Sequence, residues 1–319
     1  MRMLRTMALA GAALLALATS ASAQGAYPNQ MVRIVVPFSA GSVTDGLARI
    51  LADKLADVWK QQVIVENRPG LPGTTSVAKG QADGYTLMLT SNGHTIAGVI
   101  NKSIQFDPVK DFAGVTKVAS VPMVAVVPPD LPVKTMADFI ALAKEKPGKL
   151  NFSSAGIAST TYLSSEVLKQ AAKIDIVHVP YKGTPEATTA VIRGDAQLYF
   201  APIPMTQELS AGNKVRAIAI NSSKRSPQLP DVPTVTETVP SYDYDSWFAV
   251  LVAAGTPKPI IDKVSQDIAK VLAMPDVIEK LQAQGAVPSP TTPEALDAQV
   301  KRETELYTKV LRDAGVGTN

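Results

Sequence analysis

A strand, a loop of small residues and a helix follow one another between Val32 and Trp59, and this stretch constrains the fold more than any other. Residues 32–36 are mostly β-branched and are ended by Pro37, which indicates a buried strand. Apolar residues at helical spacing then predict an amphipathic helix: Leu47, Ile50, Leu51, Leu55 and Val58. The loop between them would direct backbone N–H groups and the positive end of a helix dipole at one point, where an anion is stabilised. An ordinary strand–loop–helix junction without a ligand is the alternative.

The same order of elements recurs about a hundred residues later. Residues 150–154 predict a strand, residues 155–161 a second small-residue loop, and the residues that follow a helix. Further strands are expected at 62–66, 85–90, 175–179, 196–200, 215–220 and 247–252, and further helices at 75–81, 135–144, 185–193, 205–211, 257–273 and 293–314. Strands that alternate with helices favour parallel α/β sheets, which bind ligands beyond the carboxyl ends of their strands. Two such loops facing one cleft could clamp a small anion.

The chain is expected to form two lobes and to cross between them twice. The first crossing lies in the β-prone stretch 115–127, which Pro122 interrupts, and the second in the proline-rich segment 221–244, which has little periodicity. We therefore predict an α/β protein with two lobes, the first formed by residues 27–124 and 243–319 and the second by residues 125–242.

Residues 1–23 have the features of a secretory signal peptide. Arg2 and Arg5 precede an apolar run, and Ala21-Ser22-Ala23 fits a cleavage site after Ala23. The run is too short to span a bilayer, and later hydrophobic stretches are interrupted by Pro, Lys or Asp. We expect an exported, periplasmic protein.

Composition excludes several classes of function. Without the two leader arginines, 29 basic residues remain against 28 acidic ones, so no nucleic acid is expected as a partner. The chain has no cysteine, which rules out a thiol nucleophile and a thiolate metal site. Its two histidines, His94 and His178, have no adjacent acidic cluster and are interpreted as structural, and Trp247 as a core residue. We expect no metal and no cofactor.

An enzyme is the alternative to a binding protein. The chain contains no G-x-S-x-G, H-E-x-x-H, P-loop or G-x-G-x-x-G motif, and its serines have no base beside them in the sequence. The binding protein, without catalysis, is the favoured interpretation. A secreted hydrolase acting on small esters is kept as the second hypothesis.

Six short motifs are spread over nearly the whole chain after the leader: 35–49 (VVPFSAGSVTDGLAR), 65–70 (VENRPG), 83–86 (DGYT), 178–183 (HVPYKG), 225–234 (RSPQLPDVPT) and 255–257 (GTP). Together, and in this order, they resemble one family, the Bug receptors of tripartite tricarboxylate transporters. The resemblance implies a periplasmic-binding-protein fold, type II-like, whose interlobe cleft holds a small carboxylate. It also implies a membrane permease as partner, and we expect a monomer. The chain differs from the family pattern at Ser42-Val43, Tyr162 and Ala201.

The ligand is expected to be a di- or tricarboxylate or an aromatic carboxylate. Its predicted binding residues come from the two loops and from the ends of neighbouring strands: Phe38, Ser39, Ala40, Gly41, Ser42, Asp45, Ser91, Asn92, Ser153, Ser154, Gly156, Thr160, Thr161, Tyr181, Pro202 and Ile203. For Asp45 the alternative is a surface acid that complements the helix dipole.

Overall fold

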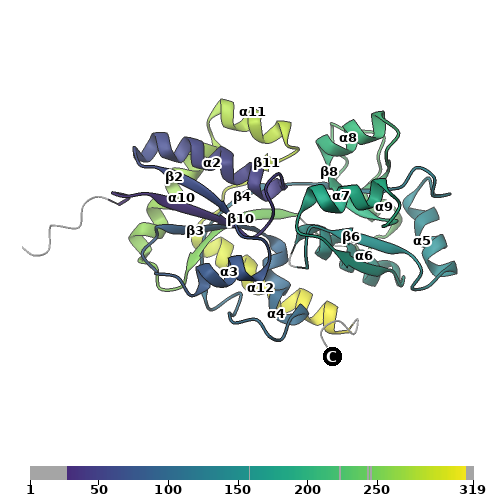
Figure 1. Ribbon diagram of the computed structural model, residues 1–319, viewed down its shortest axis with the longest axis horizontal. Helices are drawn as coiled ribbons and strands as arrows, with labels where there is room; N and C mark the ends of the chain where they lie inside the picture. The colour runs from purple at the N-terminus through teal and green to yellow at the C-terminus, as the bar shows by residue number, and fades with distance from the viewer. Residues whose placement is uncertain (1–26, 158, 223, 243, 245, 314–319) are drawn as a thin grey trace, which may run out of the picture.

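The structure is a computed structural model that describes residues 27–313 except 158, 223, 243 and 245. The predicted signal peptide and its cleavage site lie outside the described residues. Figure 1 shows two lobes side by side, which confirms the two-lobed α/β fold.

The first lobe is built on a six-stranded sheet with the strand order β11-β4-β10-β3-β1-β2. Its elements come from both ends of the chain: β1 (Val32–Val36), α2 (Val43–Trp59), β2 (Val63–Asn67), α3 (Leu71–Ala78), β3 (Thr86–Ser91), the 3-10 helix η2 (Asn92–Ile96), α4 (Ala97–Ile100), β4 (Phe112–Ser120), β10 (Trp247–Ala253), α10 (Lys258–Leu272), α11 (Pro275–Ala283), β11 (Val287–Pro288) and α12 (Pro293–Asp313).

Both faces of this sheet are covered, because side chains alternate along each strand. Ile34 and Val36 of β1 pack in a core with residues of α2 and α10, whereas Val35 packs in a second core with residues of α3 and α12. Trp247 is fully buried in that second core, which confirms it as a core residue.

The second lobe contains a three-stranded sheet, β8-β5-β9, and a parallel pair, β6-β7. Its elements are β5 (Met123–Val127), α5 (Met136–Glu145), β6 (Asn151–Ser154), α6 (Thr160–Ala172), β7 (Val177–Pro180), α7 (Thr184–Ile192), β8 (Tyr199–Pro202), α8 (Ile203–Ala211), β9 (Arg216–Ile220) and α9 (Val235–Thr238). In Figure 1 this lobe carries the teal and green middle of the chain.

The expectation of parallel sheets is correct only in part. β1 pairs in parallel with β2 and β3, but β10 is antiparallel to both β3 and β4, and β5 is antiparallel to both β8 and β9. The direction of β10 follows from the chain path. β4 leaves the first lobe at Ser120, and the returning chain starts β10 beside it, with Val121 N donating to Ser246 O at 2.9 Å. Because the chain re-enters the first lobe beside the end of β4, β10 runs in the direction opposite to that of β4.

Several elements were not expected from the sequence. The helices α4, α9 and α11, the 3-10 helix η2 and the short strand β11 are new, and α3 begins at Leu71 instead of Thr75. Most of them are short, so they carry little periodicity. The segment 221–244 is otherwise irregular, as its prolines suggested, and the lobe bounds stay a prediction.

Candidate functional site

Three helix N-termini meet between the lobes. α2 begins at Val43 in the first lobe, and α6 and α7 begin at Thr160 and Thr184 in the second. They surround a cavity of about 20 Å³, which has room for about one water molecule. Among the described residues, its lining contains seven hydroxyl side chains and no charged one: Phe38, Ser42, Val43, Thr44, Ser91, Met123, Ala155, Ser159, Thr160, Thr161, Thr184 and Phe248. We call this space the hydroxyl cavity.

Serine caps set two of these N-termini. Ser42 Oγ accepts a hydrogen bond from Asp45 N at 3.2 Å, and Ser159 Oγ accepts one from Tyr162 N at 3.2 Å. The first N–H groups of an α-helix have no partner inside the helix. The N–H groups of Val43 and Thr44 at the start of α2 are therefore suited to meet an acceptor in the cavity.

Asp45 holds the first loop in place. Its carboxylate accepts hydrogen bonds from Gly41 N at 2.9 Å, Arg49 Nε at 3.0 Å and Asn67 Nδ2 at 3.0 Å. Burial alone would raise the pKa of Asp45, but the hydrogen bonds from Arg49, Gly41 and Asn67 outweigh it and leave that pKa below its ordinary value. Asp45 is buried, so the alternative of a surface acid is wrong. Its side chain lines neither of the cavities described here.

Replacing Asp45 with alanine should destabilise the protein by about 2–3 kcal/mol, because hydrogen bonds to a buried carboxylate are lost together. The folded-state pKa is lowered, so this stabilisation is present above the unfolded value and lost as the pH falls through the folded pKa. Urea denaturation at pH 7 measures the effect. Asp53→Ala in the same helix, where the carboxylate is exposed, should change stability by less than about 0.5 kcal/mol. Equal effects of both substitutions would contradict the role assigned to Asp45.

The two lobes are in direct contact around the hydroxyl cavity. Ser39 N donates to Lys182 O at 3.2 Å, Thr160 N donates to Ser91 Oγ at 3.1 Å, and Thr160 Oγ1 donates to Asn92 Oδ1 at 2.6 Å. Ser39 Oγ also donates to Glu186 Oε2 at 3.3 Å. Each bond joins one lobe to the other, so the cleft is closed at this point.

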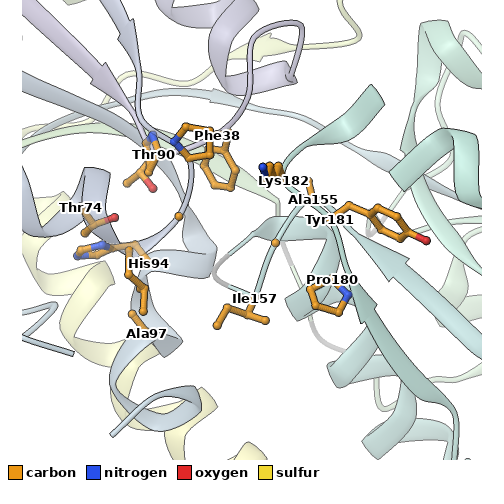
Figure 2. A pocket seen from close by; sticks show the side chains of 15 residues that line it. Phe38, Thr74, Thr90, His94, Ala97, Ala155, Ile157, Pro180, Tyr181 and Lys182 are labelled. Carbon is orange, nitrogen blue, oxygen red and sulfur yellow. The ribbon is translucent and has the colours of Figure 1, made fainter. Parts of the chain in front are cut away.

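A second, larger cavity of about 480 Å³ lies next to the hydroxyl cavity, and Phe38 and Ala155 line both. Figure 2 shows its walls, with labelled side chains of the first lobe on the left and of the second lobe on the right. We call it the interlobe chamber. Its lining residues are Pro37, Phe38, Pro69, Gly70, Leu71, Thr74, Thr90, His94, Ala97, Ala155, Gly156, Ile157, Pro180, Tyr181 and Lys182.

Both histidines are neutral at pH 7. Burial lowers the pKa of His94 to about 4, and burial together with the nearby charge of Lys169 lowers the pKa of His178 to about 4. His94 Nε2 lies 2.9 Å from the carbonyl oxygen of Pro108, so Nε2 carries the proton and donates. His94 also lines the interlobe chamber, a position that sequence reasoning did not assign to it.

Stability should fall as the pH is lowered from about 6.5 to about 4. The unfolded histidines have pKa values near 6.5 and the folded ones about 4, so the unfolded chain binds more protons in this window. By pH 5 each histidine should cost about 2 kcal/mol relative to pH 7. Urea denaturation at both pH values tests this, and His94→Gln should remove about half of the difference. An unchanged pH dependence in that variant would contradict the assignment.

Ser154 and His178 form a serine–histidine contact, with 2.6 Å between Oγ and Nε2. Neither residue lines the hydroxyl cavity or the interlobe chamber. The Ser154 side chain is fully buried, and a histidine with a pKa of about 4 is a weak base at pH 7. This contact therefore offers no support for the hydrolase hypothesis.

The structure brings together seven of the sixteen predicted ligand-binding residues at the two cavities. Ser42, Ser91, Thr160 and Thr161 line the hydroxyl cavity, Gly156 and Tyr181 the chamber, and Phe38 both. The remaining ones line neither cavity: Ser39, Ala40, Gly41, Asp45, Asn92, Ser153, Ser154, Pro202 and Ile203. Ser39 and Asn92 instead make contacts between the lobes.

Sequence reasoning missed much of the chamber wall. Residues 69–71, Thr74 and Ala97 were given no part in the predicted site. The motif VENRPG marks the first of these segments, but nothing in its spacing indicates that it faces the residues 180–182. At the hydroxyl cavity Thr44 and Thr184 were missed, and their positions at the start of α2 and α7 are the signal that could have found them.

Among the described residues, no helix combines the length and the apolar character that crossing a membrane requires. No group of three or more histidine, cysteine, aspartate or glutamate side chains in that part of the chain is arranged to hold a metal ion.

Comparison with known families gives one match over most of the chain. Residues 47–310 match the family described as the tripartite tricarboxylate transporter family receptor. Protein BugT of Bordetella pertussis is 34% identical over 295 residues, which cover 91% of this chain and 90% of that protein.

Solved structures of similar sequence share the fold. R. palustris Rpa4515 with adipate has 32% identity and a TM-score of 0.84, and covers 91% of this chain and 99% of its own. The periplasmic binding protein BugD has 32% identity and a TM-score of 0.83, with the same coverage. MatC from Rhodopseudomonas palustris with bound malate has 29% identity and a TM-score of 0.83, and covers 89% of this chain and 100% of its own. Nothing among these similarities supports the secreted hydrolase.

Proposed function

Since the chain belongs to the tripartite tricarboxylate transporter receptor family, we propose that it captures a small carboxylate in its interlobe cleft. The observation that carries the proposal is the meeting of three helix N-termini at a cavity lined by hydroxyl groups and by no acidic side chain. Carboxylates bound by Rpa4515 and MatC, adipate and malate, support the ligand class.

The physical basis is a set of donors that are already in place. Partial positive charge at the N-termini of α2, α6 and α7 stabilises an anion, and hydroxyl groups such as that of Thr44 can donate to it. A hydrogen bond to a charged group contributes about 1.5–3 kcal/mol. Several of them, less the cost of immobilising a small ligand, give micromolar affinity. The carboxylate group is larger than the hydroxyl cavity, so the loops must separate slightly to admit it.

The site residues in this proposal are those predicted from the sequence that line a cavity, joined by Thr44, Ser159 and Thr184. Asp45 acts through the loop that it holds. The protein releases its ligand unchanged, as expected of a solute receptor. Turnover of generic esters that disappears with one serine substitution would overturn this part.

We place the hinge where the chain crosses between β4 and β5 and where it returns before β10. The lobes then correspond to residues 27–124 with 243–319 and to residues 125–242. Limited proteolysis should release fragments that end in the segment 221–244. Cleavage within β10 instead would count against these bounds.

The receptor acts in the periplasm as a monomer, after export directed by residues 1–23 and cleavage after Ala23. Membrane passage of the ligand then requires a permease to which the closed receptor docks. Uptake of the identified carboxylate should stop when the permease genes are deleted, and unchanged uptake would contradict this partnership. Sequencing the amino terminus of the secreted protein tests the cleavage site.

A thermal-shift screen of dicarboxylates, tricarboxylates, aromatic carboxylates and amino acids tests the ligand class. A ligand at a hundred times its dissociation constant stabilises the folded state by about 2.7 kcal/mol, which raises the melting temperature by about 5–10 °C. We expect such a shift from carboxylates. Shifts from uncharged sugars or cationic amines alone would contradict the proposed function.

A further inference from the structure

The wall of the interlobe chamber is mostly apolar. Ten of its fifteen lining residues are proline, glycine, alanine, leucine, isoleucine or phenylalanine. They come from both lobes, with Leu71 and Ala97 on one side and Ile157 and Pro180 on the other. The volume of about 480 Å³ is within the range of small-molecule sites. A polar ligand body would lose its hydration here and gain few hydrogen bonds in return.

The polar groups of the wall are few and mostly uncharged. Thr74 and Thr90 supply hydroxyls, His94 is neutral at pH 7, and the Tyr181 ring points away from the first lobe in Figure 2. Among the described residues of the wall, Lys182 is the one besides His94 with a basic or acidic side chain, and it is exposed. Apart from Lys182, the described residues of the wall offer no group that could neutralise a charge on the body of a ligand.

We propose that the interlobe chamber holds an apolar ligand body, so that the substrate class is a carboxylate with an alkyl or aromatic body. This inference rests on the proposed function, because the carboxylate enters the hydroxyl cavity while the body stays in the chamber. Phe38 lines both spaces and lies where the two parts of the ligand join. A second carboxylate is compatible only near Lys182, whose backbone oxygen accepts a hydrogen bond from Ser39 N, next to Phe38. Citrate and malate carry hydroxyl and charged groups on short bodies and fit poorly.

Calorimetric titration with butyrate, hexanoate and octanoate tests the inference, with citrate and malate as the contrasting probes. Each buried methylene contributes about 0.8 kcal/mol, so affinity should rise about fourfold per methylene until the chamber is filled. Citrate and malate should bind at least tenfold more weakly than hexanoate. If citrate or malate binds best and chain length has no effect, this inference is wrong and the carboxylate receptor stands. If no acid binds and neutral compounds do, the proposed function itself fails.

A substitution in the wall gives a second test. Ile157 lies in a loop, is partly exposed and belongs to no core cluster, so Ile157→Asn should fold. It should weaken hexanoate binding about tenfold and reduce the gain in affinity from butyrate to hexanoate. Leu306→Asn is the matched control, because Leu306 is 47% exposed on α12 and lines neither cavity. An unchanged butyrate-to-hexanoate ratio in Ile157→Asn would overturn the assignment of the chamber.

Discussion

Replacing Thr44 with aspartate should reduce carboxylate affinity about a thousandfold while the receptor stays folded. Thr44 is the second residue of α2 and lines the hydroxyl cavity. An aspartate there would place a fixed carboxylate among the donors that the ligand needs. Two negative charges about 4 Å apart repel by about 4 kcal/mol at an effective dielectric constant of 20, which corresponds to that loss. The helix dipole favours an aspartate in the first turn and offsets part of the cost of a carboxylate at this buried position, so the variant should lose some stability but remain folded.

Two controls separate charge from other effects of the Thr44 substitution. Thr44→Val keeps the shape and removes one hydroxyl, so it should weaken binding about tenfold. Ala137→Asp places the same acid at the second position of α5, which is exposed in the second lobe, and should leave binding unchanged. Calorimetry gives the affinities and urea denaturation the stability. Wild-type affinity in Thr44→Asp would mean that the carboxylate binds elsewhere.

Gly183→Val should weaken binding about a hundredfold by keeping the lobes apart. The φ of Gly183 is −173°, an extended conformation that valine adopts without strain. Its new Cβ would collide with Ser39 Oγ and lie 3.1 Å from Ser39 Cβ, and Ser39 belongs to the other lobe. Overpacking of this kind costs about 1–3 kcal/mol. The collision occurs only when the two lobes close on each other, so its cost opposes closure and lowers the affinity for the ligand.

A second substitution distinguishes blocked closure from a weakened start of α7. Adding Ser39→Gly to Gly183→Val removes both colliding atoms of Ser39, so it should restore most of the lost affinity, whereas a local effect on α7 would persist. Small-angle X-ray scattering with ligand should show a larger radius of gyration for Gly183→Val than for the wild type. Full affinity in Gly183→Val would show that the contact between Ser39 and Gly183 is absent from the ligand complex.

Two of the helix N-termini at the candidate site could be predicted because they depend on local structure. Strand, small-residue loop and helix follow one another at β1–α2 and at β6–α6, and periodicity alone places both loops at helix N-termini. The third N-terminus belongs to α7 and follows Gly183. The sequence predicts a helix there but indicates no role for it in ligand binding. Its place beside the other two depends on how the lobes pack.

The interlobe chamber could not be predicted because it also depends on how the lobes pack. Its walls come from segments that are far apart in the sequence, such as 69–71, His94 and 180–182, and only tertiary packing brings them together. The direction of β10 was missed because it depends on where the chain returns from the second lobe. Local patterns carry no information on either point.

The burial of particular side chains could also not be predicted from the sequence. Asp45 was predicted to bind the ligand, with a surface acid as the alternative, and only the positions of Gly41, Arg49 and Asn67 show that it holds the loop. Two departures from the family pattern, Tyr162 and Ala201, are buried and line neither cavity. Tyr162 packs against His178 with 4.5 Å between ring centroids. The third departure, at Ser42 and Val43, does line the hydroxyl cavity.

The central claim is that a ligand carboxylate, as an anion, is bound at the three helix N-termini. Calorimetric titration of the wild-type receptor with the carboxylate that gives the largest thermal shift, and with the corresponding neutral amide, tests it most directly. Loss of two charge-assisted hydrogen bonds should weaken the amide by about 3 kcal/mol or more, at least a hundredfold. An amide that binds within threefold of the acid would contradict the account, because the site would then not recognise the charge.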